Sequence, residues 1–238
     1  MPANWCPVSI NEEAESLVSD VIPKKMQEIF QLCKSAQLSV QHMKAIQAGS
    51  KLVEPKQVID LYVEKISLKT RSTEAGPQLA TPDVKPSIIE INFPANNSLI
   101  EIEDKLRPFA YHIVDMASTL KLWITVHIPK VEDGHNFGVS VQEDVLGEIS
   151  DFESRANAFF EIIHSYRVTR AHLVKRFLKY PHIEDFRNGI VALDEKHFTD
   201  LISQASLFRE CYVSLHRMIT LNLDKLKNPR PHSSSNMY

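Results

Sequence analysis

Apolar residues recur at steps of three and four along several long stretches of this chain, which is the spacing of one face of an α-helix. The clearest stretch follows Ser98 and Glu101, whose spacing is that of a capping box, and predicts a helix of about 30 residues. Pro108 lies off its apolar face, and Pro129 ends the pattern because proline has no N–H to donate. The apolar face consists of Ile102, Leu106, Phe109, Ile113, Met116, Leu120, Trp123 and His127.

Two further helices are predicted after this one. Ser140 and Glu143 form another capping box, so the next helix is expected to begin at Val141 and to end near Tyr180. Pro181 suits the first turn of the following helix, where a missing N–H costs nothing. Their apolar faces are Val145, Ile149, Phe152, Ala156, Phe159, Ile163, Tyr166, Leu173 and Phe177, and then Phe186, Ile190, Leu193, His197, Leu201, Ala205, Phe208, Tyr212, Leu215, Ile219 and Leu226.

The chain before these helices divides into a helical part and a linker. Residues 1–50 are expected to form the first helix, with a capping box at Ser9 and Glu12 and a kink at Pro23, where the apolar spacing changes phase. Residues 51–97 are rich in proline and short polar residues, which is typical of a partly disordered linker, with room for a short helix near 57–68. Residues 98–228 then carry the second to fourth helices, and 229–238 form a flexible tail.

Four long amphipathic helices predict an all-α protein, an elongated antiparallel four-helix bundle. Such a bundle keeps much lateral surface, so we expect side-by-side assembly that closes into a ring. Only 6 glycines among 238 residues disfavour β folds rich in tight turns and glycine-lined phosphate sites. A net charge of −3 gives no electrostatic reason to expect nucleic acid or a membrane as partner.

Candidate chemistry is sparse. The chain has no H-E-x-x-H or C-x-x-C motif, and Glu132, Asp133 and His135 lack the alternation of an EF-hand loop. Ser140 lacks the second glycine of a nucleophile elbow. We therefore expect no catalytic residue, no cofactor and no metal site. Three distant cysteines, without a secretory signal before them, suit reduced thiols and residence in the cytoplasm, the nucleus or both.

The distinctive segment is the connection between the second and third helices. Pro129 opens it, and Gly134 and Gly138 allow backbone angles that other residues resist, so the loop is expected to have a fixed shape. A helical scaffold that presents a shaped loop, without a catalytic constellation, indicates an interaction protein.

Residues 123–134 and 136–143 resemble the REG (11S regulator) family of proteasome activators. The similarity continues at residues 13–18, 23–25, 170–174, 179–187, 194–196 and 228–230 and at the final Met237 and Tyr238. It covers nearly everything except the linker. The chain has His135 where the family usually has asparagine after the loop glycine.

The resemblance implies a heptamer, formed with itself or with related subunits, that caps the 20S proteasome without ATP. The C-terminal tails would anchor between subunits of the proteasome α-ring, and residues 128–142 would be the activation loop that opens its gate. The implied gate contacts are Lys130, Val131, Glu132, Asp133, Gly134, His135, Asn136, Phe137 and Gly138, and the implied docking residues are Asn236, Met237 and Tyr238. The alternative is an oligomeric helical scaffold or adaptor that binds partners other than the proteasome.

Overall fold

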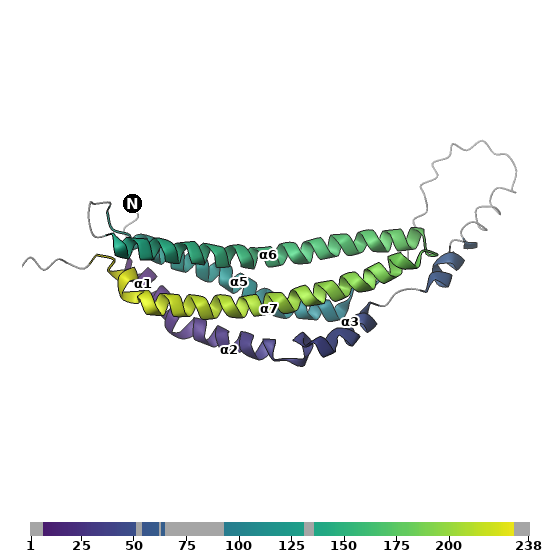
Figure 1. Ribbon diagram of the computed structural model, residues 1–238, viewed down its shortest axis with the longest axis horizontal. Coiled ribbons are helices and arrows are strands. Elements are labelled where there is room, and N and C mark those ends of the chain that lie inside the picture. The colour runs from purple at the N-terminus through teal and green to yellow at the C-terminus, as the bar shows by residue number, and fades with distance from the viewer. Residues whose placement is uncertain (1–6, 51–53, 62, 65–92, 131–135, 231–238) are drawn as a thin grey trace, which may run out of the picture. The chain divides into compact units, whose positions relative to one another are not determined.

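The computed structural model describes residues 7–50, 54–61, 63–64, 93–130 and 136–230, and every regular element among them is helical (Figure 1). The all-α prediction is therefore confirmed. The elements are α1 (Pro7–Ser16), a π-helix (Leu17–Val21), α2 (Ile22–Cys33), 3₁₀ turns (Ala36–Leu38 and Val40–His42), α3 (Met43–Gly49), α5 (Asn97–Val126), α6 (Phe137–Lys179) and α7 (Glu184–Lys227). Residues 55–61 are also helical.

Two expected helix starts are wrong. Helix α6 begins at Phe137 and not at Val141, because the Ser140 amide already donates to the Asn136 carbonyl at 3.0 Å. Helix α7 begins at Glu184, and Pro181 lies in the preceding turn. Helix α5 has the expected length, with 30 residues, and contains the exposed Pro108.

A single helix over residues 1–50 is also wrong. Ser35 and Ser39 have extended backbone angles, with ψ of 149° and 151°, and these interrupt the helical run between α2 and α3. Pro23 lies in the first turn of α2, directly after the π-helix, and the residues before it, Val21 and Ile22, keep helical backbone angles. The helical run therefore continues past this proline.

The helices form two compact units, which are described separately. Unit 1 contains Met1–His42, Glu101–His164 and Thr199–Tyr238, and unit 2 contains Met43–Ile100 and Ser165–Phe198. Helices α5, α6 and α7 contribute residues to both units.

Unit 1 is a four-helix bundle of the α1–α2 run, α5, α6 and α7, as predicted. The early part of α1 meets the late part of α5, since Trp123 Nε1 donates to Asn11 Oδ1 at 2.8 Å. The Phe159 and Phe208 rings join α6 to α7, with centroids 5.4 Å apart in an edge-to-face arrangement. The largest buried side chains here include Trp123, Tyr212, Phe159, Phe208, Leu106 and Ile113. These side chains lie on the apolar faces expected from the sequence.

A half-buried histidine, His112, contacts this core. His112 Nδ1 is 2.9 Å from the hydroxyl oxygen of Tyr212, and the two rings are tilted against each other at 5.7 Å. Burial, and then the positive charge of Lys25, lower the pKa of His112, while Asp115 and Glu28 oppose the shift. The folded bundle therefore disfavours the protonated imidazole.

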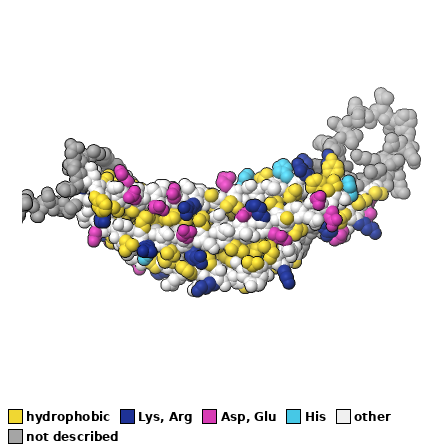
Figure 2. Space-filling view, in the orientation of Figure 1, with side chains coloured by type: hydrophobic (Ala, Val, Ile, Leu, Met, Phe, Trp, Pro, Cys, Tyr) yellow, Lys and Arg dark blue, Asp and Glu magenta, His cyan; other side chains and the backbone are white. Residues whose placement is uncertain are grey.

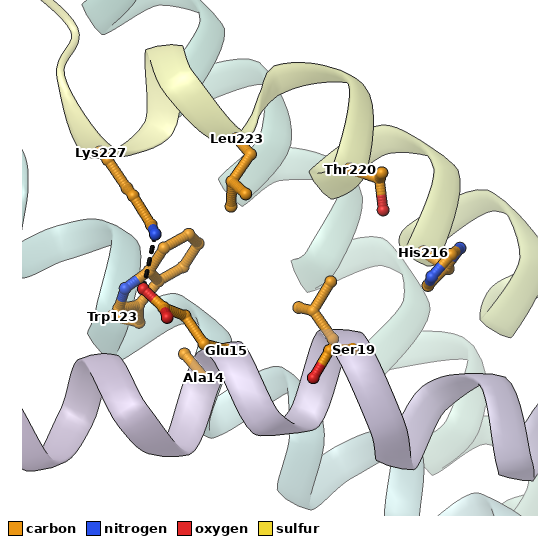
Figure 3. A pocket seen from close by; sticks show the side chains of 9 residues that line it. Ala14, Glu15, Ser19, Trp123, His216, Thr220, Leu223 and Lys227 are labelled. Carbon is orange, nitrogen blue, oxygen red and sulfur yellow. Dashed lines mark hydrogen bonds and ion pairs between the residues drawn. The ribbon is translucent and has the colours of Figure 1, made fainter.

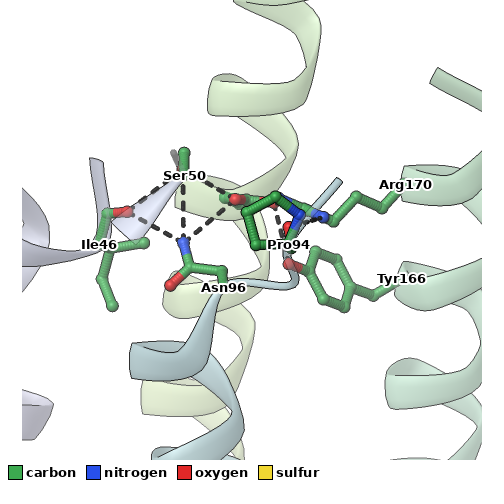
Figure 4. A network of polar contacts seen from close by, with 7 residues as sticks. Ile46, Ser50, Pro94, Asn96, Tyr166 and Arg170 are labelled. Carbon is green, nitrogen blue, oxygen red and sulfur yellow. Dashed lines mark hydrogen bonds and ion pairs between the residues drawn. The ribbon is translucent and has the colours of Figure 1, made fainter. Parts of the chain in front are cut away.

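Unit 2 is organised around a buried carboxylate (Figure 4). Asp194 is fully buried and accepts hydrogen bonds from Ser50 at 2.8 Å, Asn96 at 3.1 Å, Tyr166 at 2.9 Å and Arg170 at 3.0 Å. These donors come from the residue after α3, the residue before α5, and α6. One side chain of α7 thus connects three other segments of the chain.

The arginine of this network extends the contacts to the end of the linker. Arg170 Nη1 donates to the Pro94 carbonyl at 3.2 Å, and its guanidinium lies 5.6 Å from the Phe93 ring centre. The Phe93 ring in turn packs edge to face on Phe177. Phe177, Val58 and Ile190 form the buried apolar cluster of this unit. The residues on either side of the linker are therefore fixed to the helices.

We predict that Asp194→Asn destabilises the protein by about 3 kcal/mol or more, because it leaves the buried Arg170 without its counter-charge. Urea unfolding followed by circular dichroism measures this difference. Asp151→Asn, at an exposed position of α6, is the matched control and should change stability by less than about 0.5 kcal/mol. Equal effects of the two substitutions would contradict the role assigned to Asp194.

We predict that His112 makes the free energy of unfolding depend on pH. The His112 pKa is lower in the folded chain than the usual value of about 6.5, so the unfolded chain binds the proton more readily. The stabilisation from neutral His112 is complete above that usual value and is lost as pH falls toward the lowered pKa. Unfolding free energies measured from about pH 7 to 5 should fall less steeply for His112→Gln than for the parent chain.

Candidate functional site

The end of α5, the start of α6 and the end of α7 meet at a single buried side chain. Gln142 is fully buried, and its Nε2 donates to the carbonyls of His127 at 3.2 Å and Leu226 at 2.9 Å. Both carbonyls lie where a helix ends and its last acceptors lack intrahelical partners. The amide therefore satisfies acceptors of two helix ends at once.

The end of α5 carries a second such contact. His127 follows the last residue of the helix, and its Nδ1 donates to the Trp123 carbonyl at 2.8 Å. The imidazole also lies edge to face against the Trp123 ring, with centroids 5.5 Å apart. His127 is half-buried, so the expected apolar face of this helix ends in a capping contact.

Gly138 lies against the chain that leaves α7. It is the second residue of α6, and a Cβ built on it would stand 2.0 Å from the Pro229 carbonyl oxygen. Such a contact is impossible without moving the backbone. The structure thus corrects the expectation that Gly138 serves the loop by its backbone angles, because this glycine is helical and allows a close approach.

Arg230 joins the same chain to both ends of the loop. Its Nη1 donates to the Lys130 carbonyl and its Nη2 to Asn136 Oδ1, each at 3.0 Å. Nearby, Lys225 Nζ lies 4.8 Å from the centre of the Phe137 ring, which is 71% exposed. We call the contacts of Gln142, Gly138 and Arg230 with their partners the loop–tail joint.

The structure describes part of the expected site. Lys130, Asn136, Phe137 and Gly138 are brought to the loop–tail joint, whereas residues 131–135 and the expected docking residues Asn236, Met237 and Tyr238 lie outside the described residues. Residues 137–142 are helical, so the loop ends earlier than the expected range of 128–142.

Sequence reasoning missed three members of the joint, namely Gln142, Pro229 and Arg230. Gln142 was expected at the end of the loop, and Pro229 and Arg230 were expected where the last helix stops and the tail begins, but none of the three was expected to join helix ends. Gln142 and its partner Leu226 are 84 residues apart in the chain, and Arg230 and its partner Lys130 are 100 residues apart. No local spacing signals a contact of this range.

Metal binding and membrane insertion have no counterpart among the described residues. Among the described residues, no group of His, Cys, Asp and Glu side chains could hold a metal ion, and no described helix combines the length and apolar character needed to cross a membrane. On the face that Figure 2 shows, positive and negative side chains are interspersed over the described residues. The loop–tail joint is therefore the candidate functional site.

Two protein-family models and curated relatives match this chain. The family model "Proteasome activator PA28, C-terminal" matches residues 92–236, and "Proteasome activator PA28, N-terminal" matches residues 6–51. The chain is 33% identical over 234 residues to proteasome activator complex subunit 3 of Homo sapiens. The aligned region covers 96% of this chain and 92% of that protein.

Solved structures show the same fold. The 11S subunit of the Plasmodium falciparum proteasome, PA28, superimposes with a TM-score of 0.72 at 22% identity, covering 94% of this chain and 88% of that one. PA26, solved in a complex with an archaeal 20S proteasome, gives a TM-score of 0.67 at 14% identity, covering 98% and 94%.

We predict that Gly138→Ala loosens the loop–tail joint. The added methyl group cannot fit beside the Pro229 carbonyl, so α6 and the chain after α7 must separate locally. Hydrogen exchange should become faster by about tenfold at residues 127–130 and 226–230, with little change elsewhere. Gly147→Ala is the matched control, since nothing lies within 4 Å of its Cβ, and it should stabilise α6 by about 0.5–1 kcal/mol. Unchanged exchange in the Gly138 variant would mean that the close approach does not hold the joint.

Proposed function

Because the chain belongs to the PA28 family of proteasome activators, we propose that it is an ATP-independent activator of the 20S proteasome and has no catalytic residues of its own. We propose further that its subunits form a heptameric ring on the end of the 20S particle, in the cytoplasm, the nucleus or both. In this proposal the C-terminal tails anchor the ring between α-subunits, and the loops open the gate.

The loop–tail joint is the observation that carries this proposal. An activator of this kind has to place its loop at a fixed position relative to the point where its tail is bound. Arg230 begins the tail and is hydrogen-bonded to Lys130 and Asn136, on the two sides of the loop. Binding energy gained at the tail can therefore hold the loop in place, which supports a role in gate opening.

The tail suits an anchor of low individual affinity. Residues 231–238 contain one proline, at position 231, three serines at 233–235, and the apolar groups of Met237 and Tyr238. A single tail of this length buries little surface. Several tails on one ring raise the effective concentration of each, and the avidity can exceed that of one tail by about 10²- to 10⁴-fold.

Stimulation of fluorogenic peptide hydrolysis by purified, latent 20S proteasome, without ATP, tests the proposal directly. We expect the full-length protein to stimulate hydrolysis. A stable assembly that neither binds the 20S particle nor stimulates it would instead support an oligomeric scaffold for other partners.

We predict that two variants separate anchoring from gate opening. Deletion of Met237 and Tyr238 should abolish both co-sedimentation with the 20S particle and stimulation, because the anchor is lost. Arg230→Gln should keep co-sedimentation but lower stimulation by about tenfold, because the loop is no longer tied to the tail by a charge-assisted contact.

The controls are matched to each variant. Ser233→Gly together with Ser234→Gly changes the tail without shortening it, and Lys44→Gln removes one exposed positive charge that is not part of the joint. Both should behave like the parent protein. If the truncated protein still binds and stimulates, the anchor lies elsewhere. If Arg230→Gln stimulates fully, the joint does not position the loop.

A further inference from the structure

A pocket of about 370 Å³ opens within unit 1, between the π-helix region and α7 (Figure 3). Its apolar lining includes Val18, Leu223 and the buried Trp123, and the Trp123 ring lies beside Lys227 and Glu15. The Glu15–Lys227 ion pair lies at one end, and His216 lies at the other. This volume falls within the range of small-molecule sites in proteins.

The π-helix accounts for one wall of the pocket. Val18 and Ser19 belong to the segment Leu17–Val21, where the wider turn changes the face that the chain presents to α7. Single π-helical turns inside α-helices occur often at functional sites. The π-helix ends just before Pro23, where the apolar spacing of the sequence changes phase.

The polar groups of the pocket favour an anion. Lys227 is paired with Glu15 at 2.5 Å, but both side chains are partly exposed, at 32% and 52%, so the pair contributes little and an incoming carboxylate can replace Glu15. His216 is half-buried and has no hydrogen bond to a described residue. The pocket thus has one donor at each end, Lys227 and His216, and its acidic side chain, Glu15, is the more exposed member of the ion pair.

The length of the pocket fixes the rest of the ligand. His216, Thr220, Leu223 and Lys227 lie on one face of α7, and the first and last are separated by about 16 Å along the helix. A carboxylate at Lys227 therefore has room for an apolar body of about two helical turns over Leu223, Val18 and Trp123. We propose that this pocket binds an amphipathic carboxylate, a molecule with one anionic head and an apolar body of this length.

Octanoate and octylammonium test the proposal, because they share an apolar chain and differ in the charge of the head. Calorimetric titration of the full-length protein should show saturable binding of octanoate at one site per chain and at least about tenfold weaker binding of octylammonium. In a Trp5→Phe background, Trp123 is the remaining tryptophan, and its fluorescence should change with the same midpoint.

Two pairs of variants make the result specific. Leu223→Trp fills the pocket and should abolish octanoate binding, whereas Leu221→Trp, at a 70% exposed position of the same helix, should leave it unchanged. Lys227→Met should weaken binding by about tenfold, whereas Lys225→Met should not. Circular dichroism checks the fold of each variant, and the Lys227 pair decides the question if Leu223→Trp does not fold.

Three results would overturn the proposal. These are equal binding of octylammonium, equal loss of binding in Leu221→Trp and Leu223→Trp, and a Trp123 signal that does not saturate. The measurement does not involve the 20S particle, so its failure would leave the proposed function untouched.

Discussion

One buried amide, that of Gln142, determines where the loop and the tail leave the bundle. Helix ends expose carbonyls without partners, and a buried carbonyl without a partner is costly. Gln142 donates to one such carbonyl after α5 and to another at the end of α7. The segments that follow these two helix ends therefore start from the same place, and the close approach of Gly138 to Pro229 depends on this arrangement.

In unit 2, too, one buried side chain forms hydrogen bonds to several segments of the chain, but there the side chain is the carboxylate of Asp194. Asp194 collects hydrogen bonds from Ser50, which precedes the linker, and from Asn96, which follows it, and these two side chains also approach each other at 3.4 Å. The residues between them thus begin and end at one point. Because the entropy of closing a loop grows only slowly with its length, such a linker can change in length at small cost to the fold.

The helical faces could be predicted from the sequence because burial along a helix repeats every three to four residues. Trp123, Phe159 and Phe208 lie on the predicted faces and are fully buried. The helix starts were harder to predict, because a capping box is a short local pattern. Ser140 has the right spacing to cap a helix, but the backbone already forms helical bonds from Asn136, one turn earlier.

Buried polar residues could not be predicted from the same pattern. Asp194 and Gln142 interrupt the apolar spacing, and a sequence does not tell whether such a residue faces water or a partner from another helix. Both are fully buried here, with partners from distant parts of the chain. Only the three-dimensional contacts distinguish a solvated polar residue from one that joins helix ends.

The types of atom that form the loop–tail joint determine which substitutions the loop can accept. Gln142 binds the His127 and Leu226 carbonyls, Gly138 lies against the Pro229 carbonyl, and Arg230 binds the Lys130 carbonyl. The acceptors of these hydrogen bonds are main-chain oxygens, which every residue type supplies, and the side-chain acceptor of the joint is Asn136 Oδ1, which binds Arg230 Nη2. The position of the loop base is therefore largely independent of the side chains between Lys130 and Asn136. A substitution inside the loop, such as His135 in place of the family's usual asparagine, can alter what the loop contacts while its base stays where the bundle holds it.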